Sequence, residues 1–109
     1  MQKVVEEAIN LLNKIFSERF DDFHGLYLYG VFTDGKNHRD EDIELVAIFD
    51  VENKYKRELI WPIVGKIETD LDVFIDLHPI TMAELVKDED FYDEVVNKGI
   101  FFVTNHQKS

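Results

Sequence analysis

Hydrophobic and polar positions along the chain follow two helical patterns and several strand-like runs. In residues 4–19 and again in 55–67, apolar side chains recur every three or four positions, which predicts two amphipathic helices. Pro62 should kink or divide the second helix, because proline lacks an amide N–H and clashes with the preceding turn. Strands are predicted over 26–30, 42–49 and 71–77, and short helices over 81–86 and 91–97. Strands interleaved with helices indicate an α/β domain.

Two of the predicted strands differ in how they should lie in the sheet. Residues 42–49 carry apolar side chains on both faces, which is typical of a central strand. Residues 100–103 form a short apolar run near the C-terminus, which we interpret as a last edge strand. The alternative is an edge that binds a partner, since exposed strand edges recruit other chains.

Length and composition favour one folded domain over residues 1–109. The chain is 45% hydrophobic, which suffices for a packed core, and it has no cysteine, so disulfides and thiolate metal sites are excluded. No signal pattern is visible, and no apolar run approaches the roughly 20 residues that a membrane span needs. A cytoplasmic protein without membrane contact is therefore expected, and the sequence leaves a homodimer open.

The charge of the chain bears on its partners. The formal net charge is −11, from 23 acidic against 12 basic residues. Proteins that bind long RNA or DNA show a basic patch, and none is visible here. The sequence thus argues against nucleic acid as the principal ligand, and a solvated acidic surface is the simplest interpretation of most of these charges.

Three carboxylates following a glycine carry the candidate chemistry. Gly30 ends the first strand, and residues 32–41 separate Gly30-Val31 from Asp42 and Glu44 on the second. Strand side chains alternate between faces, so these two acids point the same way, about 7 Å apart. Asp72 opens the third predicted strand, and Asp76 is its rival as a third acid. Such a set suits a divalent cation like Mg²⁺, which prefers oxygen ligands beside substrate phosphates.

The order of these motifs resembles the minimal nucleotidyltransferases of the DNA polymerase β superfamily. The family has a hydrophobic strand, Gly-Ser, about ten residues, an acid-hydrophobic-acid triplet, and a later acid on another strand. Here these correspond to Leu26–Tyr29, Gly30, Asp42-Ile43-Glu44 and Asp72, and the similarity extends over residues 24–103. It implies a mixed sheet of three or four strands with helices mainly on one side.

The chain departs from the family pattern in the loop after the glycine. The family serine, which contacts nucleotide phosphates, is replaced by Val31, and a frequent basic residue is replaced by Asp34, whereas the second turn glycine is kept as Gly35. Val31 removes a hydroxyl donor and Asp34 adds a negative charge. We therefore expect weak nucleotide binding.

The resemblance implies an activity, cofactors and a partner. Asp42, Glu44 and Asp72 would be catalytic, holding two Mg²⁺ ions, while Gly30, Val31 and Gly35 would contact the nucleotide, with ATP favoured. The reaction would move a nucleoside monophosphate from an NTP to a hydroxyl of a small acceptor or a partner protein, with a small helical HEPN-type protein as candidate partner. The alternative is a degenerate antitoxin or binding module that neutralises such a partner without catalysis.

Overall fold

The computed structural model describes residues 1–104 and is built around a four-stranded mixed sheet. The strands are β1 (Phe23–Tyr29), β2 (Ile43–Phe49), β3 (Ile75–Ile80) and β4 (Ile100–Val103), in the spatial order β3-β2-β1-β4. β2 runs parallel to β3 and antiparallel to β1, which is itself antiparallel to β4. The predicted mixed α/β fold is confirmed, and the strand predicted over 42–49 is present as the central strand β2, which begins one residue later.

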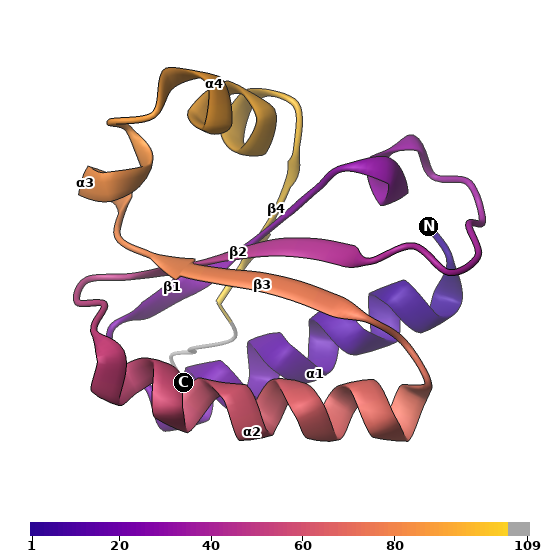
Figure 1. Cartoon of the computed structure of the whole chain (residues 1–109), viewed down its shortest axis with the longest axis horizontal. Helices are drawn as coiled ribbons and strands as arrows, with labels where there is room; N and C mark the ends of the chain where they lie inside the picture. The colour runs from indigo at the N-terminus through magenta and orange to yellow at the C-terminus, as the bar shows by residue number, and fades with distance from the viewer. Residues whose placement is uncertain (105–109) are drawn as a thin grey trace.

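Two long helices cover one face of this sheet. α1 (Lys3–Arg19) and α2 (Lys54–Leu71) lie side by side beneath the strands (Figure 1). Alternate residues of β2 point toward them and join the main core, among them Ile43, Leu45, Ala47 and Phe49. Burial of these apolar side chains holds the helices against the sheet. No helix within residues 1–104 is long and apolar enough to cross a membrane.

The opposite face is covered only in part, by a C-terminal cap. This cap consists of α3 (Met82–Leu85), α4 (Glu89–Tyr92) and the π-helical turn η2 (Asp93–Asn97), which lie above the sheet in Figure 1. Leu85 and Val95 of the cap pack on Val46 and Ile48 of β2. At Gly99 a Cβ atom would lie 2.2 Å from the Val95 carbonyl oxygen, so glycine lets the chain return closely to the sheet.

Several predicted boundaries move in the structure. β1 begins at Phe23, before the predicted start at residue 26, and α4 begins at Glu89, capped by Asp88, before the predicted helix start at residue 91. α2 is continuous through Pro62, and the predicted division of the helix is wrong. Pro62 and Glu58 are both exposed, so the carbonyl left without its helical amide faces water.

The third strand shows the largest difference from prediction, because it begins at Ile75 instead of residue 71. α2 runs on through Leu71 and ends at Asp72, whose left-handed conformation (φ 54°) turns the chain. Glu68 fixes this end: its carbonyl accepts from the N–H groups of Asp72 and Val73, and its carboxylate accepts from Ile75 N–H at 2.8 Å. Residues 71–74, predicted as the start of the strand, therefore form the end of α2 and the turn that follows it.

β4 is an edge strand, as predicted, and its end is partly covered. The Asn13 side-chain amide, from α1, donates to the Val103 carbonyl at 2.8 Å. That carbonyl lies on the side away from β1, because Thr104 N–H bonds to the His24 carbonyl and successive residues alternate. A side-chain cap on an edge carbonyl reduces its capacity to pair with another strand.

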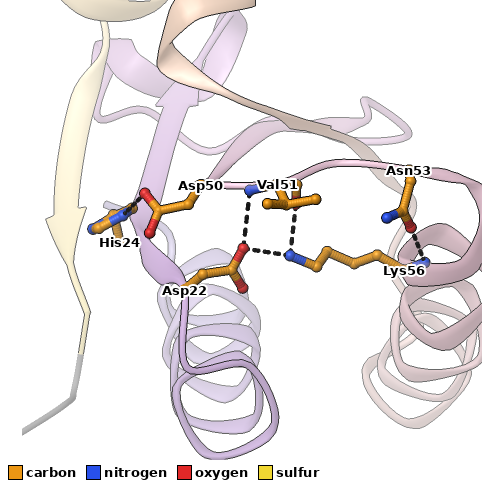
Figure 2. Close-up of polar contacts among 6 residues, drawn as sticks. All are labelled: Asp22, His24, Asp50, Val51, Asn53 and Lys56. Atoms are coloured by element: carbon orange, nitrogen blue, oxygen red, sulfur yellow. Dashed lines mark hydrogen bonds and ion pairs between the residues drawn. The ribbon is translucent and has the colours of Figure 1, made fainter.

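A polar cluster joins the chain entering β1 to the loop between β2 and α2 (Figure 2). The Lys56 ammonium lies 2.5 Å from the Asp22 carboxylate, 2.6 Å from the Val51 carbonyl and 4.4 Å from the centre of the Phe49 ring. Asp22 also accepts from Val51 N–H at 3.0 Å. Burial alone would raise the pKa of Asp22, but Lys56 and Val51 outweigh it and lower that pKa.

We expect Asp22→Asn to destabilise the fold by about 1.5–3 kcal/mol at pH 7, because it removes hydrogen bonds to a charged group. The depressed pKa means that this contribution is present above the ordinary aspartate pKa of about 3.9 and is lost as pH falls through the lower folded value. The difference between parent and variant should therefore shrink below about pH 4. Urea unfolding at a series of pH values measures it.

Asp50→Asn is the matched control for this substitution. Asp50 pairs with His24 at 2.6 Å, next to the Asp22 cluster, but both side chains are more than half exposed. Exposed ion pairs contribute about 0–1 kcal/mol. Equal losses in the two variants would contradict the special role of the Lys56 cluster.

Candidate functional site

One row of polar side chains crosses the sheet on the face opposite α1 and α2. Tyr29 of β1 is paired in register with Glu44 of β2, and Glu44 is paired with Asp76 of β3. The neighbours of Glu44 along β2, Ile43 and Leu45, point into the helix-covered core, so alternation directs Glu44 to the opposite face. Three adjacent strands thus place a phenol and two carboxylates side by side.

The electrostatics of Glu44 show which charges gather there. Burial raises the pKa of Glu44, and Asp76, Asp42 and Glu94 raise it further by repulsion, in that order. Asp42 lies just before β2, and Glu94 belongs to η2 of the cap. Three carboxylates, from β3, from the chain before β2 and from the cap, therefore act on Glu44 at this end of the sheet.

His78 and Tyr29 lie beside this acidic cluster. The His78 ring nitrogen Nε2 lies 3.4 Å from Asp76 Oδ1, and its charge, when protonated, opposes the rise in the Glu44 pKa. Tyr29 is buried beside the cluster, and burial followed by Glu44, Asp76 and Glu94 raises the pKa of its phenol. The hydroxyl therefore stays protonated throughout the neutral range.

Asp72 does not lie in this row. It caps the end of α2 and lines a hollow of about 210 Å³ with the start of α1 and the loop before β2, in company with Phe32 and His38. It is not among the charges that raise the pKa of Glu44. Its predicted position at the opening of a strand is wrong, because the left-handed turn separates it from β3, whereas Asp76 is in register with Glu44.

Gly30 forms the turn directly after Tyr29 and touches the acidic cluster. Its backbone (φ 83°, ψ −153°) occupies a region that is essentially restricted to glycine. A Cβ atom there would lie 2.0 Å from Glu44 Oε2, so the carboxylate fills the space that any side chain would need. Gly30 therefore forms a turn whose backbone lies directly against the Glu44 carboxylate.

The loop after Gly30 contains η1 (Val31–Asp34) and the predicted nucleotide-side residues. Val31 is exposed, Phe32 is buried, and Gly35 adopts the left-handed conformation (φ 77°). Asp34 does not present an unpaired charge: its carboxylate contacts His38 Nε2 at 3.0 Å and accepts from Lys36 N–H at 2.7 Å. These contacts, led by His38, lower the pKa of Asp34. The repulsion expected from this residue is therefore partly compensated within the loop.

The carboxylate oxygens at this site are ligands of the kind that a hard divalent cation prefers, although they are not close enough together to enclose one. Glu44, Asp76 and Asp42 offer carboxylate oxygens, which Mg²⁺ and Mn²⁺ prefer. Within residues 1–104, no group of three or more His, Cys, Asp or Glu side chains is close enough to hold a metal ion directly. Mutual repulsion of the carboxylates disfavours such closeness without a cation.

Sequence reasoning missed two residues of this site. Tyr29 has no role of its own in the motifs that the sequence shows, and its place one residue before Gly30 sets it beside the acid row only once β1 and β2 are paired. Glu94 gave no signal, because it is one of many acids in a polar segment. Only the folding of the cap onto the sheet brings it near Glu44.

Comparison with solved structures identifies the fold. A toxin–antitoxin structure with AMP-PNP matches 94% of this chain and 75% of its own, at 23% identity and a TM-score of 0.64. A tri-AMPylated Shewanella oneidensis HEPN toxin in complex with MNT antitoxin matches at 20% identity, 89% and 70% coverage, and a TM-score of 0.57. A toxin–antitoxin MntA–HepT structure matches with the same identity and TM-score. The chain thus has the minimal nucleotidyltransferase fold of these antitoxins. No protein-family model and no curated protein sequence matches it.

The contact between Gly30 and Glu44 leads to a testable expectation. Gly30→Ala should lower the free energy of unfolding by about 1–3 kcal/mol, because alanine is strained in this conformation and its Cβ displaces the Glu44 carboxylate. Gly35→Ala is the control: it also has positive φ, but its Cβ would meet nothing within 4 Å. It should cost about 1 kcal/mol. Chemical denaturation measures both, and equal effects would contradict a steric role for Glu44.

Proposed function

We propose that this chain is a nucleotidyltransferase-type antitoxin that transfers a nucleoside monophosphate from an NTP, with ATP favoured, to a hydroxyl of a HEPN-type partner. The observation that carries this proposal is the row of Glu44 and Asp76, with Asp42 beside it, next to a glycine turn in a minimal nucleotidyltransferase fold. The expected setting is the cytoplasm, where nucleoside triphosphates are available.

The carboxylates assigned to metal binding are Asp42, Glu44 and Asp76. Asp76 replaces Asp72 in this proposal, because register places it beside Glu44 and its charge is the strongest neighbouring influence on Glu44. A cation between them would offset the repulsion that raises the Glu44 pKa. Bound Mg²⁺, as two ions in the active form, would stabilise developing charge on the attacking and leaving oxygens of the transferred phosphoryl group.

The chain's own residues supply positioning on each side of this metal set. Gly30 keeps the backbone close to Glu44, and we assign Gly30, Val31 and Gly35 to the nucleotide side of the site. The Asp34–His38 pair holds the loop together and limits the negative charge that it presents. His78 lies 3.4 Å from Asp76 and, when protonated, pairs with that carboxylate.

The partner assignment follows from the neighbours and from the size of the domain. The matched structures are toxin–antitoxin complexes, and one of the HEPN toxins is tri-AMPylated. Residues 1–104 form a sheet with its covering helices and offer no second domain that could present an acceptor hydroxyl. A partner protein would therefore bring the hydroxyl to the carboxylate row.

A second function, neutralisation of the partner by binding alone, is favoured by Val31. This exposed valine stands where the family has a phosphate-binding hydroxyl. Its loss would weaken nucleotide affinity by roughly 1.5–3 kcal/mol, on the scale for hydrogen bonds to charged groups. In that case the fold and the interface would persist while turnover is lost.

The choice of third carboxylate can be tested with Mn²⁺. At tenfold over its dissociation constant, Mn²⁺ should stabilise the parent by about 1.4 kcal/mol, because it binds only the folded state. Asp76→Asn and Glu44→Gln should abolish this gain, whereas Asp72→Asn should retain it. Thermal melts with and without Mn²⁺ measure the effect. Loss of the gain in Asp72→Asn but not in Asp76→Asn would return the role to Asp72.

Transfer itself is tested with α-labelled ATP. The purified chain, Mg²⁺ and the HEPN toxin of the Shewanella oneidensis complex are incubated, and label on the toxin is followed together with release of pyrophosphate. We expect labelled toxin with the parent and at least a hundredfold less (about 2.7 kcal/mol) with Glu44→Gln. Toxin that co-purifies with the chain but stays unlabelled would favour the binding-only function. Absence of both labelling and binding would contradict the partner assignment.

A further inference from the structure

Tyr29 is buried beside Glu44, its register partner on β2, and no described residue forms a hydrogen bond with its hydroxyl. Its residue is only 6% exposed, and its ring packs edge-on against Phe91 of the cap, with 5.5 Å between ring centres. Within residues 1–104 the hydroxyl makes no hydrogen bond. A buried hydroxyl normally finds a partner, because leaving it unpaired costs free energy. A hydroxyl that no protein group engages is free to donate to a ligand bound at this site.

The surroundings of Tyr29 restrict what that ligand can be. Glu44, Asp76 and Glu94 are the charges that act on the phenol, so it lies in a negative field. A phenol is neutral at pH 7, and it can donate one hydrogen bond through its O–H. An anion would enter this field only with a cation that the carboxylates hold. A metal-bound phosphate meets both conditions.

The Tyr29 hydroxyl also lies close in sequence to Val31, where the loop lacks a side-chain hydrogen-bond donor. Tyr29 is two residues before Val31, and Gly30 between them turns beside Glu44. The Val31 side chain carries no hydrogen-bonding group, whereas Tyr29 is in register with Glu44 and lies on the same face of the sheet as the acidic row. Packing against Phe91 fixes the ring, so the hydroxyl needs little further ordering when a ligand binds.

We propose that the Tyr29 hydroxyl donates a hydrogen bond to a phosphate oxygen of the metal-bound nucleotide and so replaces the hydroxyl that Val31 does not provide. This proposal rests on the proposed function, because it needs the carboxylates to hold a metal–nucleotide complex. Tyr29 is then a nucleotide-positioning residue that belongs to the sheet instead of the loop. It also predicts that the natural chain binds nucleotide in spite of Val31.

The test compares Tyr29→Phe with Tyr27→Phe. Both substitutions remove only a hydroxyl from the same face of β1, but Tyr27 stacks on Phe101, one row further from Glu44. Calorimetry is done first with Mn²⁺ alone and then with ATP in excess Mn²⁺. Tyr29→Phe should leave the Mn²⁺ affinity within about twofold and weaken ATP about tenfold, whereas Tyr27→Phe should change neither. Adding Val31→Ser to Tyr29→Phe should recover most of the ATP affinity.

The outcomes separate this inference from the function on which it rests. Unchanged ATP affinity in Tyr29→Phe would overturn the role of the hydroxyl and leave the proposed function standing. A loss of Mn²⁺ affinity in Tyr29→Phe would overturn it too, because the hydroxyl would then act on the metal or on the fold. A parent chain that binds neither Mn²⁺ nor ATP would overturn the proposed function, and the inference with it.

Discussion

The structure depends on strand β2, which is buried on both faces and paired on both edges. Its odd-numbered residues pack into the apolar cluster between the sheet and the helices α1 and α2. Val46 and Ile48 pack into a separate cluster between the sheet and the C-terminal cap. The face of β2 that points away from α1 and α2 is polar only near the start of the strand, at Glu44. Because the rest of β2 cannot shift register without exposing apolar side chains, Glu44 is held at a fixed place between Tyr29 and Asp76.

The site therefore derives its geometry from the sheet and its charge from several elements. β1, β2 and β3 place Tyr29, Glu44 and Asp76 in one row, while η2 brings Glu94 and the chain before β2 brings Asp42. Burial raises the pKa of Glu44, and repulsion from these like charges raises it further. Rigid strands maintain this unfavourable arrangement, which is a common property of sites that bind cations.

The same sheet separates binding chemistry from stabilising chemistry. The acidic row lies where β2 begins, and the Asp22–Lys56 cluster lies where β2 ends and α2 starts (Figure 2). Lys56 compensates Asp22 with a hydrogen bond and covers the Phe49 ring, so this end contains a satisfied polar network. The acidic row has carboxylates and a phenol without equivalent compensation. That contrast distinguishes a candidate ligand site from a structural polar cluster.

The sequence by itself determined the helices α1 and α2, the central position of β2 and the glycine turn, because each follows from local periodicity or backbone chemistry. It could not determine the third carboxylate. Asp72 and Asp76 both fit an apolar run, and only the helix end at Asp72, fixed by Glu68, decides where β3 begins. Tyr29 and Glu94 likewise became site residues only through register and packing of the cap, which are long-range contacts that no local pattern encodes.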